Sequence, residues 1–470
     1  MSISTQKHYN NEKGAANKMR EKQQKQMSLM EPVSSHPQER ELEAISNIID
    51  NTPTISEYVL QDLNRGRIIK RRTGARGMSA DQVLRAAIVM RLFEFTYEQL
   101  AFNIYDSRCL RRFCRIGFAD KGFKKSALNA NIKSLSEQTW EMIFRDLLGH
   151  AEQEGIEKGR KVRIDCTVVE SNIHKPFDSV QLFDCVRVLT RLLETARDHF
   201  GAKIIFTDHR RRAKRRMVGI QYAKGDKQRQ PLYEDLLKVT RKVIGYTRTA
   251  EGSLKQLSCA DIGLLGLLHE IKHYAGLSEQ VYDQTYRRVI QGETVPAQQK
   301  VVSIFEDHTD IIIKDNRDTH YGHKICLTGG ASNLILDCVI LEGNPADTDL
   351  LERMLDRQER LYGRYPLKVA LDGGFASKAN LLKAKDRKIK DVCFAKKRGL
   401  DETDMCRSEY VYKKLRRFRA GIESGISWLK RSFGLTRCTW KGFRSFKCYV
   451  LSSVVAANLL TMARKKLAAT

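Results

Sequence analysis

The sequence is poor in proline and has no pattern of paired cysteines. Its 470 residues include only 8 Pro, and its composition excludes collagen-like, mucin-like and coiled-coil chains. The 11 Cys are odd in number and scattered, and no two of them form a C-x-x-C pair. This usage is typical of buried thiols in a reducing cytosol rather than of a disulfide framework.

Long hydrophobic runs are also missing. The longest apolar stretch, residues 448–463, contains two Ser, an Asn and a Thr. It is shorter than the roughly 20 residues that a membrane span needs, so we predict a buried terminal helix there. Charged and Gln-rich residues stand at the N-terminus, where a signal peptide would have an apolar segment. We therefore expect a cytoplasmic protein with no membrane partner.

Acidic residues are outnumbered. The 83 Lys and Arg exceed the 56 Asp and Glu, which gives a net charge of +27. Residues 396–470 hold 18 cations and 5 acids, so 13 of these charges are in the last 75 residues, and residues 210–216 hold six cations in seven positions. Concentrated positive charge binds phosphate through counterion release. This favours nucleic acid as the partner over a solubilising surface or an anionic membrane.

The length predicts about three domains, and the pattern changes along the chain accordingly. Residues 1–45 are polar and aperiodic, so we expect a mobile arm. Residues 46–155 have helical periodicity, with capping boxes at 79–82 and 96–99. Short helices that restart abruptly are typical of a helix-turn-helix DNA reader and equally of a plain helical bundle.

At Lys161 the hydrophobic period changes to two, which predicts a strand that carries Asp165 on its open face. Strands and helices alternate from about residue 320 onward, which indicates an α/β sheet. If the strand at 161–169 completes that sheet, residues 156–180 and 300–470 form one α/β core. Residues 181–299 are then a mostly helical, basic insertion.

Two aspartates occupy strand positions where chemistry is common. Asp165 lies within a strand, and Asp372 ends the apolar strand 367–371. Sites in open α/β sheets gather at strand ends. Two carboxylates repel each other unless a cation lies between them, and Mg²⁺ prefers such oxygen ligands. Taken singly, each aspartate fits a turn or cap residue better.

A third acid lies on a predicted helix near the C-terminus. At about 100° per residue, Glu423 is about 40° from Arg419 and Lys430 is about 20° from it, so the three share one stripe. An apolar stripe beside them allows the helix to pack on the sheet; it consists of Ile422, Ile426, Leu429 and Phe433. The alternative is a surface helix with an ordinary Arg–Glu pair.

These three segments resemble the motifs of the DDE transposases of bacterial insertion sequences. The spacing Arg419-(3)-Glu423-(6)-Lys430 is similar to the Y-(2)-R-(3)-E-(6)-K signature of that family, with Arg416 where the signature has Tyr. Residues 163–176 and 371–375 resemble the first and second acidic motifs. The resemblance runs over most of the chain from about residue 50 and is nearest to the ISNCY group.

The resemblance implies an RNase H-like α/β catalytic core with an all-helical N-terminal DNA-binding domain and a helical insertion. Asp165, Asp372 and Glu423 would be catalytic and would hold two Mg²⁺ ions, with Mn²⁺ as a substitute. Arg419 and Lys430 would hold DNA phosphates. The partners would be the terminal inverted repeats of the element and its target DNA, bound by a homodimer in the bacterial cytoplasm, associated with the nucleoid. We expect further DNA contacts from the basic insertion, through Arg210, Arg211, Arg212, Arg215 and Arg216.

Two alternative functions remain open. An inactive DNA-binding descendant of a transposase would have nearly the same sequence, and metal-dependent nicking of DNA would distinguish the two. The segment His269-Glu270-x-x-His273 also matches the zinc metalloprotease motif, with Glu279 as a further candidate ligand. Proteolysis would leave the charge of +27 unexplained, so the protease is a remote alternative.

Overall fold

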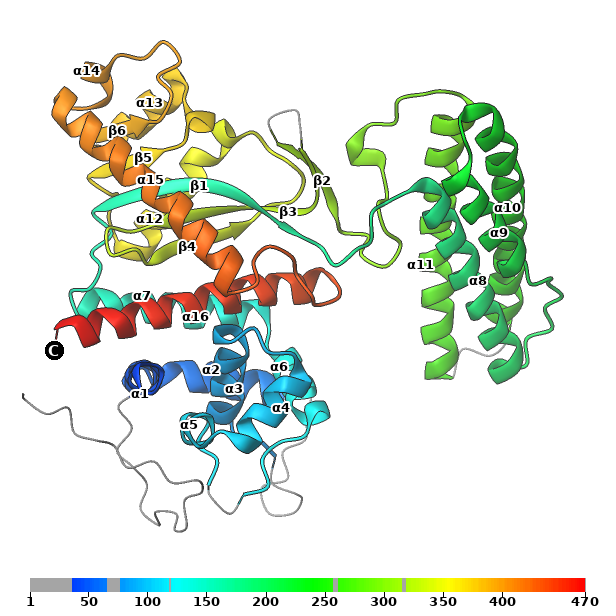
Figure 1. Ribbon diagram of the computed structural model, residues 1–470, viewed down its shortest axis with the longest axis horizontal. Helices are drawn as coiled ribbons and strands as arrows, with labels where there is room; N and C mark the ends of the chain where they lie inside the picture. The colour runs from blue at the N-terminus through cyan, green and yellow to red at the C-terminus, as the bar shows by residue number, and fades with distance from the viewer. Residues whose placement is uncertain (1–35, 66–76, 118–119, 257–260, 315–317, 470) are drawn as a thin grey trace, which may run out of the picture.

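A computed structural model describes residues 36–65, 77–117, 120–256, 261–314 and 318–469 (Figure 1). Most of the arm expected at residues 1–45 therefore lies outside the described residues. The end of that segment differs from the expectation, because the first helix, α1, begins at Pro37. Leu42, Ile45 and Ile48 bury the inner face of α1, and this burial orders it.

A mixed sheet forms the centre of the molecule. Its hydrogen-bonded order is β2-β3-β1-β5-β6, and β4 also pairs with β3. β3 runs antiparallel to β1, whereas β5 and β6 run parallel to it. The strands are β1 (Lys161–Glu170), β2 (Asp310–Lys314), β3 (Asp318–Gly329), β4 (Ile335–Ile340), β5 (Lys368–Leu371) and β6 (Asp391–Phe394). This arrangement is consistent with an RNase H-like core.

The helices of the core provide the crossovers between its parallel strands and cover the sheet. One helix separates β4 from β5, another separates β5 from β6, and α15 contacts β1, β5 and β6. Each parallel connection needs such a crossover. These elements are η3 (Asp347–Leu350), α12 (Leu351–Tyr362), η4 (Gly373–Phe375), α13 (Lys378–Asp386), α14 (Glu402–Met405) and α15 (Glu409–Ser432).

The N-terminal part is helical, as its periodicity predicts. Both capping boxes are confirmed: the Ser79 and Thr96 side chains accept from the backbone N–H groups of Gln82 and Gln99, and the glutamine side chains accept in return. The helices are α1 (Pro37–Asp50), α2 (Thr54–Asn64), α3 (Ala80–Leu92), α4 (Tyr97–Asp106), α5 (Arg108–Phe113), α6 (Lys125–Ser134) and α7 (Glu137–Gln153).

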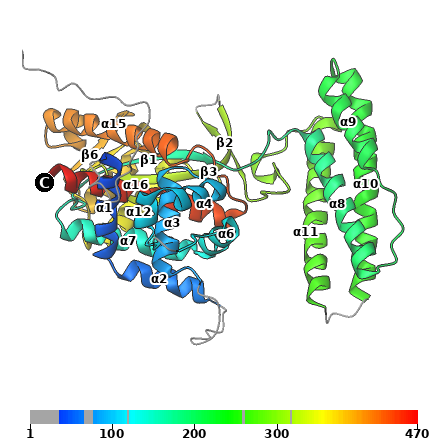
Figure 2. The ribbon, with the colours of Figure 1, turned by 60° about the horizontal axis from the view of Figure 1, so that its bottom comes forward.

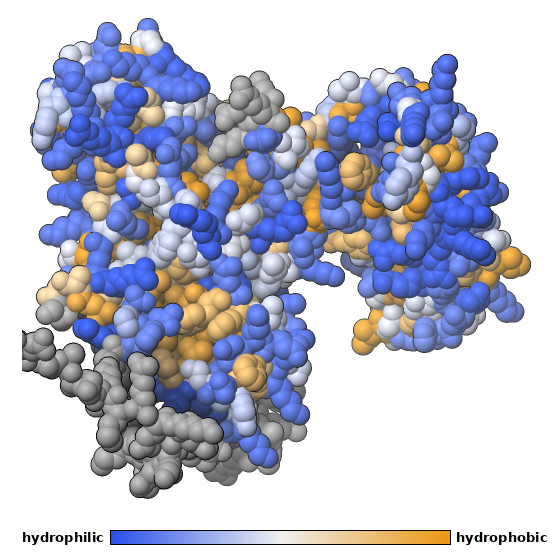
Figure 3. Space-filling view, in the orientation of Figure 1, coloured by the Kyte–Doolittle hydropathy of each residue, from blue (hydrophilic) through white to orange (hydrophobic). Residues whose placement is uncertain are grey.

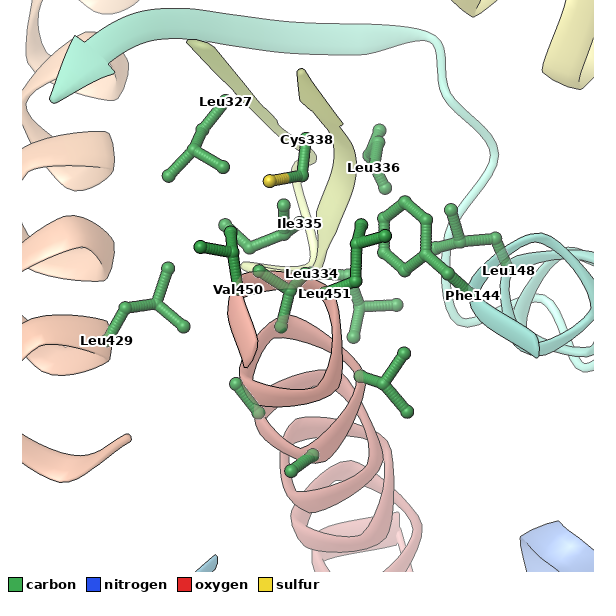
Figure 4. Close-up of a cluster of buried hydrophobic side chains, with 14 of the residues drawn as sticks. Phe144, Leu148, Leu327, Leu334, Ile335, Leu336, Cys338, Leu429, Val450 and Leu451 are labelled. Atoms are coloured by element: carbon green, nitrogen blue, oxygen red, sulfur yellow. The ribbon is translucent and has the colours of Figure 1, made fainter. Parts of the chain in front are cut away.

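The last helix, α16 (Phe443–Ala469), joins this helical region to the sheet. It contacts α1, α3, α7 and β4, and Figure 4 shows Val450 and Leu451 of α16 in one cluster with Phe144 of α7 and Ile335 of β4. One continuous hydrophobic cluster therefore spans the N-terminal helices and the sheet. By length and composition α16 is apolar enough to cross a membrane, but 83% of its most apolar window is buried inside the protein, as in a core helix.

The segment between β1 and β2 forms a helical bundle with its own hydrophobic cluster. Figures 1 and 2 both show the bundle to one side of the rest of the molecule. It begins with α8 three residues before the expected boundary at 181, and its last helical turn, η2, ends at Gln299. The elements are α8 (Asp178–Phe200), α9 (Arg210–Tyr222), α10 (Asp226–Gln256), α11 (Ile262–Thr285), η1 (Tyr286–Ile290) and η2 (Ala297–Gln299).

Candidate functional site

The three candidate acids come from distant segments and line one cavity. Asp165, Asp372 and Glu423 border an open cavity of about 900 Å³ beside the sheet. The register explains the first two: Ile164 of β1 pairs with Leu371 of β5, and the residue that follows in each case is the aspartate. Five cationic side chains line the same cavity, which we call the acidic cavity; they are Lys324, Lys396, Arg398, Lys430 and Arg431.

Arg419 connects two of the acids. Its Nη1 lies 2.8 Å from Oδ1 of Asp372, and its Nη2 donates to Oε1 of Glu423. Burial by itself would raise the pKa of the Asp372 carboxyl, but the Gly373 N–H and the Arg419 guanidinium outweigh burial and the pKa is lowered. Asp372 is therefore ionised at neutral pH. Oδ1 of Asp165 accepts from the backbone N–H of Cys166 at 2.7 Å.

The two glycines after Asp372 are required by close packing. A Cβ on Gly373 would lie 2.8 Å from Cβ of Lys396, and a Cβ on Gly374 would lie 2.4 Å from Oδ2 of Asp347. Side chains at these positions would therefore push the cavity wall apart. Asp347 is itself held by Lys324, with Nζ 2.6 Å from Oδ1. Sequence reasoning missed this half-buried pair, because nothing in the spacing of residues 324 and 347 suggests that they meet.

A buried arginine fixes α15 against β1. The Arg163 side chain donates from Nη1 to the carbonyl oxygen of Phe418 at 3.0 Å and from Nη2 to Oδ1 of Asn333 at 2.7 Å. Its guanidinium carbon also lies 4.8 Å from the centroid of the Phe418 ring. Because Arg163 is two residues before Asp165 and Phe418 precedes Arg419, this contact sets the position of the helix stripe relative to the first acid.

The donor set fits a hard divalent cation, with one rearrangement. Three carboxylates and space for water and phosphate match what Mg²⁺ prefers. Among the residues that the structure describes, no three His, Cys, Asp or Glu side chains are already close enough to hold a metal ion. The Arg419 guanidinium provides the counter-charge for Asp372 and Glu423 instead. Metal binding by all three acids therefore requires that their carboxylates move closer together, and the Arg419 guanidinium competes with the metal ion for Asp372 and Glu423.

Arg419→Gln is expected to bind Mn²⁺ more tightly than the wild-type protein in the absence of DNA. The substitution removes a competing cation, and a unit charge at about 4 Å near a protein surface is worth a few kcal/mol before screening, so we expect roughly a tenfold gain. Calorimetric titration with Mn²⁺ measures it. Arg431→Gln is the matched control, because it removes a cavity-lining cation that does not bridge the acids. Equal affinities in all three proteins would contradict the competition.

The remaining candidate residues fall in two places. Lys430 lines the acidic cavity, as its stripe predicts. The arginines of the insertion lie on α9, in the bundle. Three of them are ion-paired: Arg210 with Glu194 and Asp208, and Arg212 and Arg216 with Asp235. Arg211 and Arg215 are exposed, as is Lys214 between them.

The zinc motif is not assembled into a metal site. His269, Glu270 and His273 are exposed on α11, and Nε2 of His273 lies 3.6 Å from Oδ2 of Asp307. Glu279 is bound to the Arg248 guanidinium through both of its oxygens. Within the described ranges no third ligand completes a zinc site, so the geometry does not support the protease alternative.

Comparison with known proteins agrees with the geometry of the core. Residues 288–459 match the family model described as the transposase DDE domain. The match covers Asp372, Arg419, Glu423 and Lys430, and it begins within η1, after Asp165 and the α-helices of the bundle. No curated protein and no solved structure matches the chain. The chain thus contains a transposase DDE domain, which implies phosphoryl transfer on a DNA substrate; the match singles out no branch of insertion sequences.

Proposed function

We propose that the protein is the transposase of an insertion sequence, which binds the ends of the element, cleaves DNA strands there and joins them to target DNA. One observation carries this proposal: carboxylates from β1, the end of β5 and α15 line one cavity together with five cations. Cations clustered around acids suit the cleavage of a phosphodiester. The cations neutralise the charge of the bound phosphate, and the acids provide a metal site for the reaction.

In this proposal the acids of the cavity bind metal ions, and cationic side chains of α15 bind DNA phosphates. Asp165, Asp372 and Glu423 would hold divalent ions, which when bound activate the attacking oxygen and stabilise the leaving one. The Arg419 guanidinium, once released from the acids, offers two parallel donors to a phosphate. Lys430 places a point charge on the same stripe of α15. Both side chains would orient the scissile strand in the cavity.

The cellular setting and assembly follow from the same proposal. Transposition brings two ends together, so we propose a homodimer on DNA. We also propose a cytoplasmic, nucleoid-associated protein of bacterial origin. The ten cysteines that the structure describes are all free thiols, which suits a reducing compartment.

Cleavage of DNA that borders the gene tests the proposed function. The purified protein is incubated with labelled duplexes that contain this bordering DNA, with Mg²⁺, with Mn²⁺ or with a chelator. We expect strand cleavage at a defined position that requires the metal ion and is absent from an unrelated duplex. Binding of these ends without cleavage would instead identify an inactive, transposase-derived DNA-binding protein, and cleavage of neither DNA with no binding would refute the proposal.

The exposed cations of α9 are expected to contribute to DNA binding. Changing Arg211, Lys214 and Arg215 to alanine would remove up to three phosphate contacts. The plot of log K against log salt has a negative slope, and its magnitude should fall by up to about 2.7. Fluorescence anisotropy with a duplex at several salt concentrations measures the slope. The pair Arg212→Ala/Arg216→Ala is the control, because Asp235 already neutralises part of this charge. An unchanged slope in the triple variant would show that the insertion does not contact DNA.

A further inference from the structure

The first half of α15 carries a run of positive charge outside the acidic cavity. Four of the five residues from 413 to 417 are Lys or Arg, and all four are exposed. Several of them are three or four positions apart, as are Lys413 and Arg417, so like charges face each other along the helix. Such pairs destabilise a helix modestly, and a bound polyanion would relieve this repulsion.

Little of this charge is neutralised within the protein. Lys413 pairs with Glu409, and Nζ of Lys414 lies 6.0 Å from the centroid of the Tyr410 ring. Arg416 and Arg417 have no carboxylate within ion-pair distance among the described residues. Burial lowers the pKa of the neighbouring Lys161, and the charges of Lys414, Lys368 and Arg163 add to this effect.

Small residues follow the cations on the same side of the helix. At about 100° per residue, Arg417, Ala420 and Ser424 lie within about 60° of each other, and all three are exposed. Arg416 is about 20° from Glu423 on this projection, so it projects toward the same side of α15 as this acid of the cavity, two turns earlier in the helix. Figure 3 shows hydrophilic side chains over the region of α13–α15. A bulky partner can approach this face without displacing large side chains.

We propose that this face of α15, formed by Arg416, Arg417, Ala420 and Ser424, binds the sugar–phosphate backbone of the DNA duplex that leads to the acidic cavity. The proposal rests on the proposed function and adds a second contact surface to it. The two arginines would bind phosphates, and the alanine and serine would allow the backbone to lie close to the helix. A polyanion with regularly spaced phosphates fits unpaired like charges better than a folded protein with scattered carboxylates does.

The salt dependence of binding tests the surface. The double variant Arg416→Ala/Arg417→Ala is compared with wild type on a 40-base-pair duplex of arbitrary sequence. Loss of two phosphate contacts is expected to reduce the magnitude of the negative slope of log K against log salt by about 1.8. The matched control is Arg353→Ala/Arg360→Ala, which removes the same charge from two exposed positions of α12. Equal slopes for the two variants would overturn the proposal.

Trapping the contact provides a second measurement. Ser424→Cys replaces an exposed residue of similar size, so we expect the variant to fold. Its thiolate should attack a mixed disulfide carried on a tether of the duplex backbone, release the small leaving thiol and so link the protein to the DNA. Arg353→Cys on α12 should react much less. Equal trapping at both positions would contradict the surface even if the wild-type protein binds DNA. If the wild-type protein binds no duplex at all, the proposed function fails first.

Discussion

Asp372→Asn is expected to lower metal-dependent strand cleavage by roughly a thousandfold, because loss of a metal ligand removes several kcal/mol of transition-state stabilisation. The side chain keeps its size and remains able to accept from the Gly373 N–H, so the fold and duplex binding should change little. Cleavage of labelled end duplexes by the purified variant measures the effect. Asp165→Asn and Glu423→Gln should give losses of similar size, since all three acids line one cavity.

A conservative Asp→Asn change at a residue outside the acidic cavity controls for a general loss of folding stability. Asp337→Asn is suitable, because Asp337 is buried away from the acidic cavity and binds Arg357. It is expected to reduce stability while leaving cleavage by the folded fraction nearly unchanged. If Asp372→Asn lost folding and DNA binding together with cleavage, its loss of activity would no longer support a catalytic role.

Two glycines of α15 are expected to respond oppositely to the same substitution. A Cβ on Gly421 would lie 1.9 Å from Nη1 of Arg163, whereas a Cβ on Gly425 would meet no atom within 4 Å. Arg163 cannot move away cheaply, since it is buried and holds Phe418 and Asn333. Gly421→Ala should therefore cost about 1–3 kcal/mol through overpacking. Gly425→Ala should add about 0.5–1 kcal/mol through helix propensity.

Unfolding in urea, followed by circular dichroism, compares the two alanine variants with wild type. Gly421→Ala should also reduce cleavage by the folded protein, because displacement of α15 moves Glu423 away from Asp165. Gly425→Ala should keep wild-type cleavage. Equal stability of the two variants would show that the contact between Arg163 and α15 does not constrain the helix.

The local sequence pattern around each of the three acids is sufficient to predict it as a candidate site residue. The alternating strand around Asp165, the strand that ends at Asp372 and the helix stripe of Arg419, Glu423 and Lys430 each have short-range signals. The structure brings all three acids to one cavity. Their catalytic role is the prediction that the substitutions Asp165→Asn, Asp372→Asn and Glu423→Gln test.

Contacts between segments far apart in the sequence cannot be predicted from local pattern in the same way. The spacing of residues 163 and 421 carries no signal that a guanidinium will press against a helix glycine. The sequence pattern does not predict strand β2, because this strand is only five residues long and follows an irregular segment. In the sequence the arginines of α9 form one basic run, although Arg212 and Arg216 both bind Asp235, which is 23 and 19 positions further along the chain. Such pairings depend on helix packing, which composition does not reveal.

The most direct test of the central claim is excision and insertion in cells of a marker flanked by the DNA that borders this gene. Wild type and Asp372→Asn are compared at equal protein levels, with joined products sequenced at both ends. We expect excision and insertion with the wild-type protein and neither with the variant. Equal activity of the two proteins would contradict the assignment of the acidic cavity as the catalytic centre.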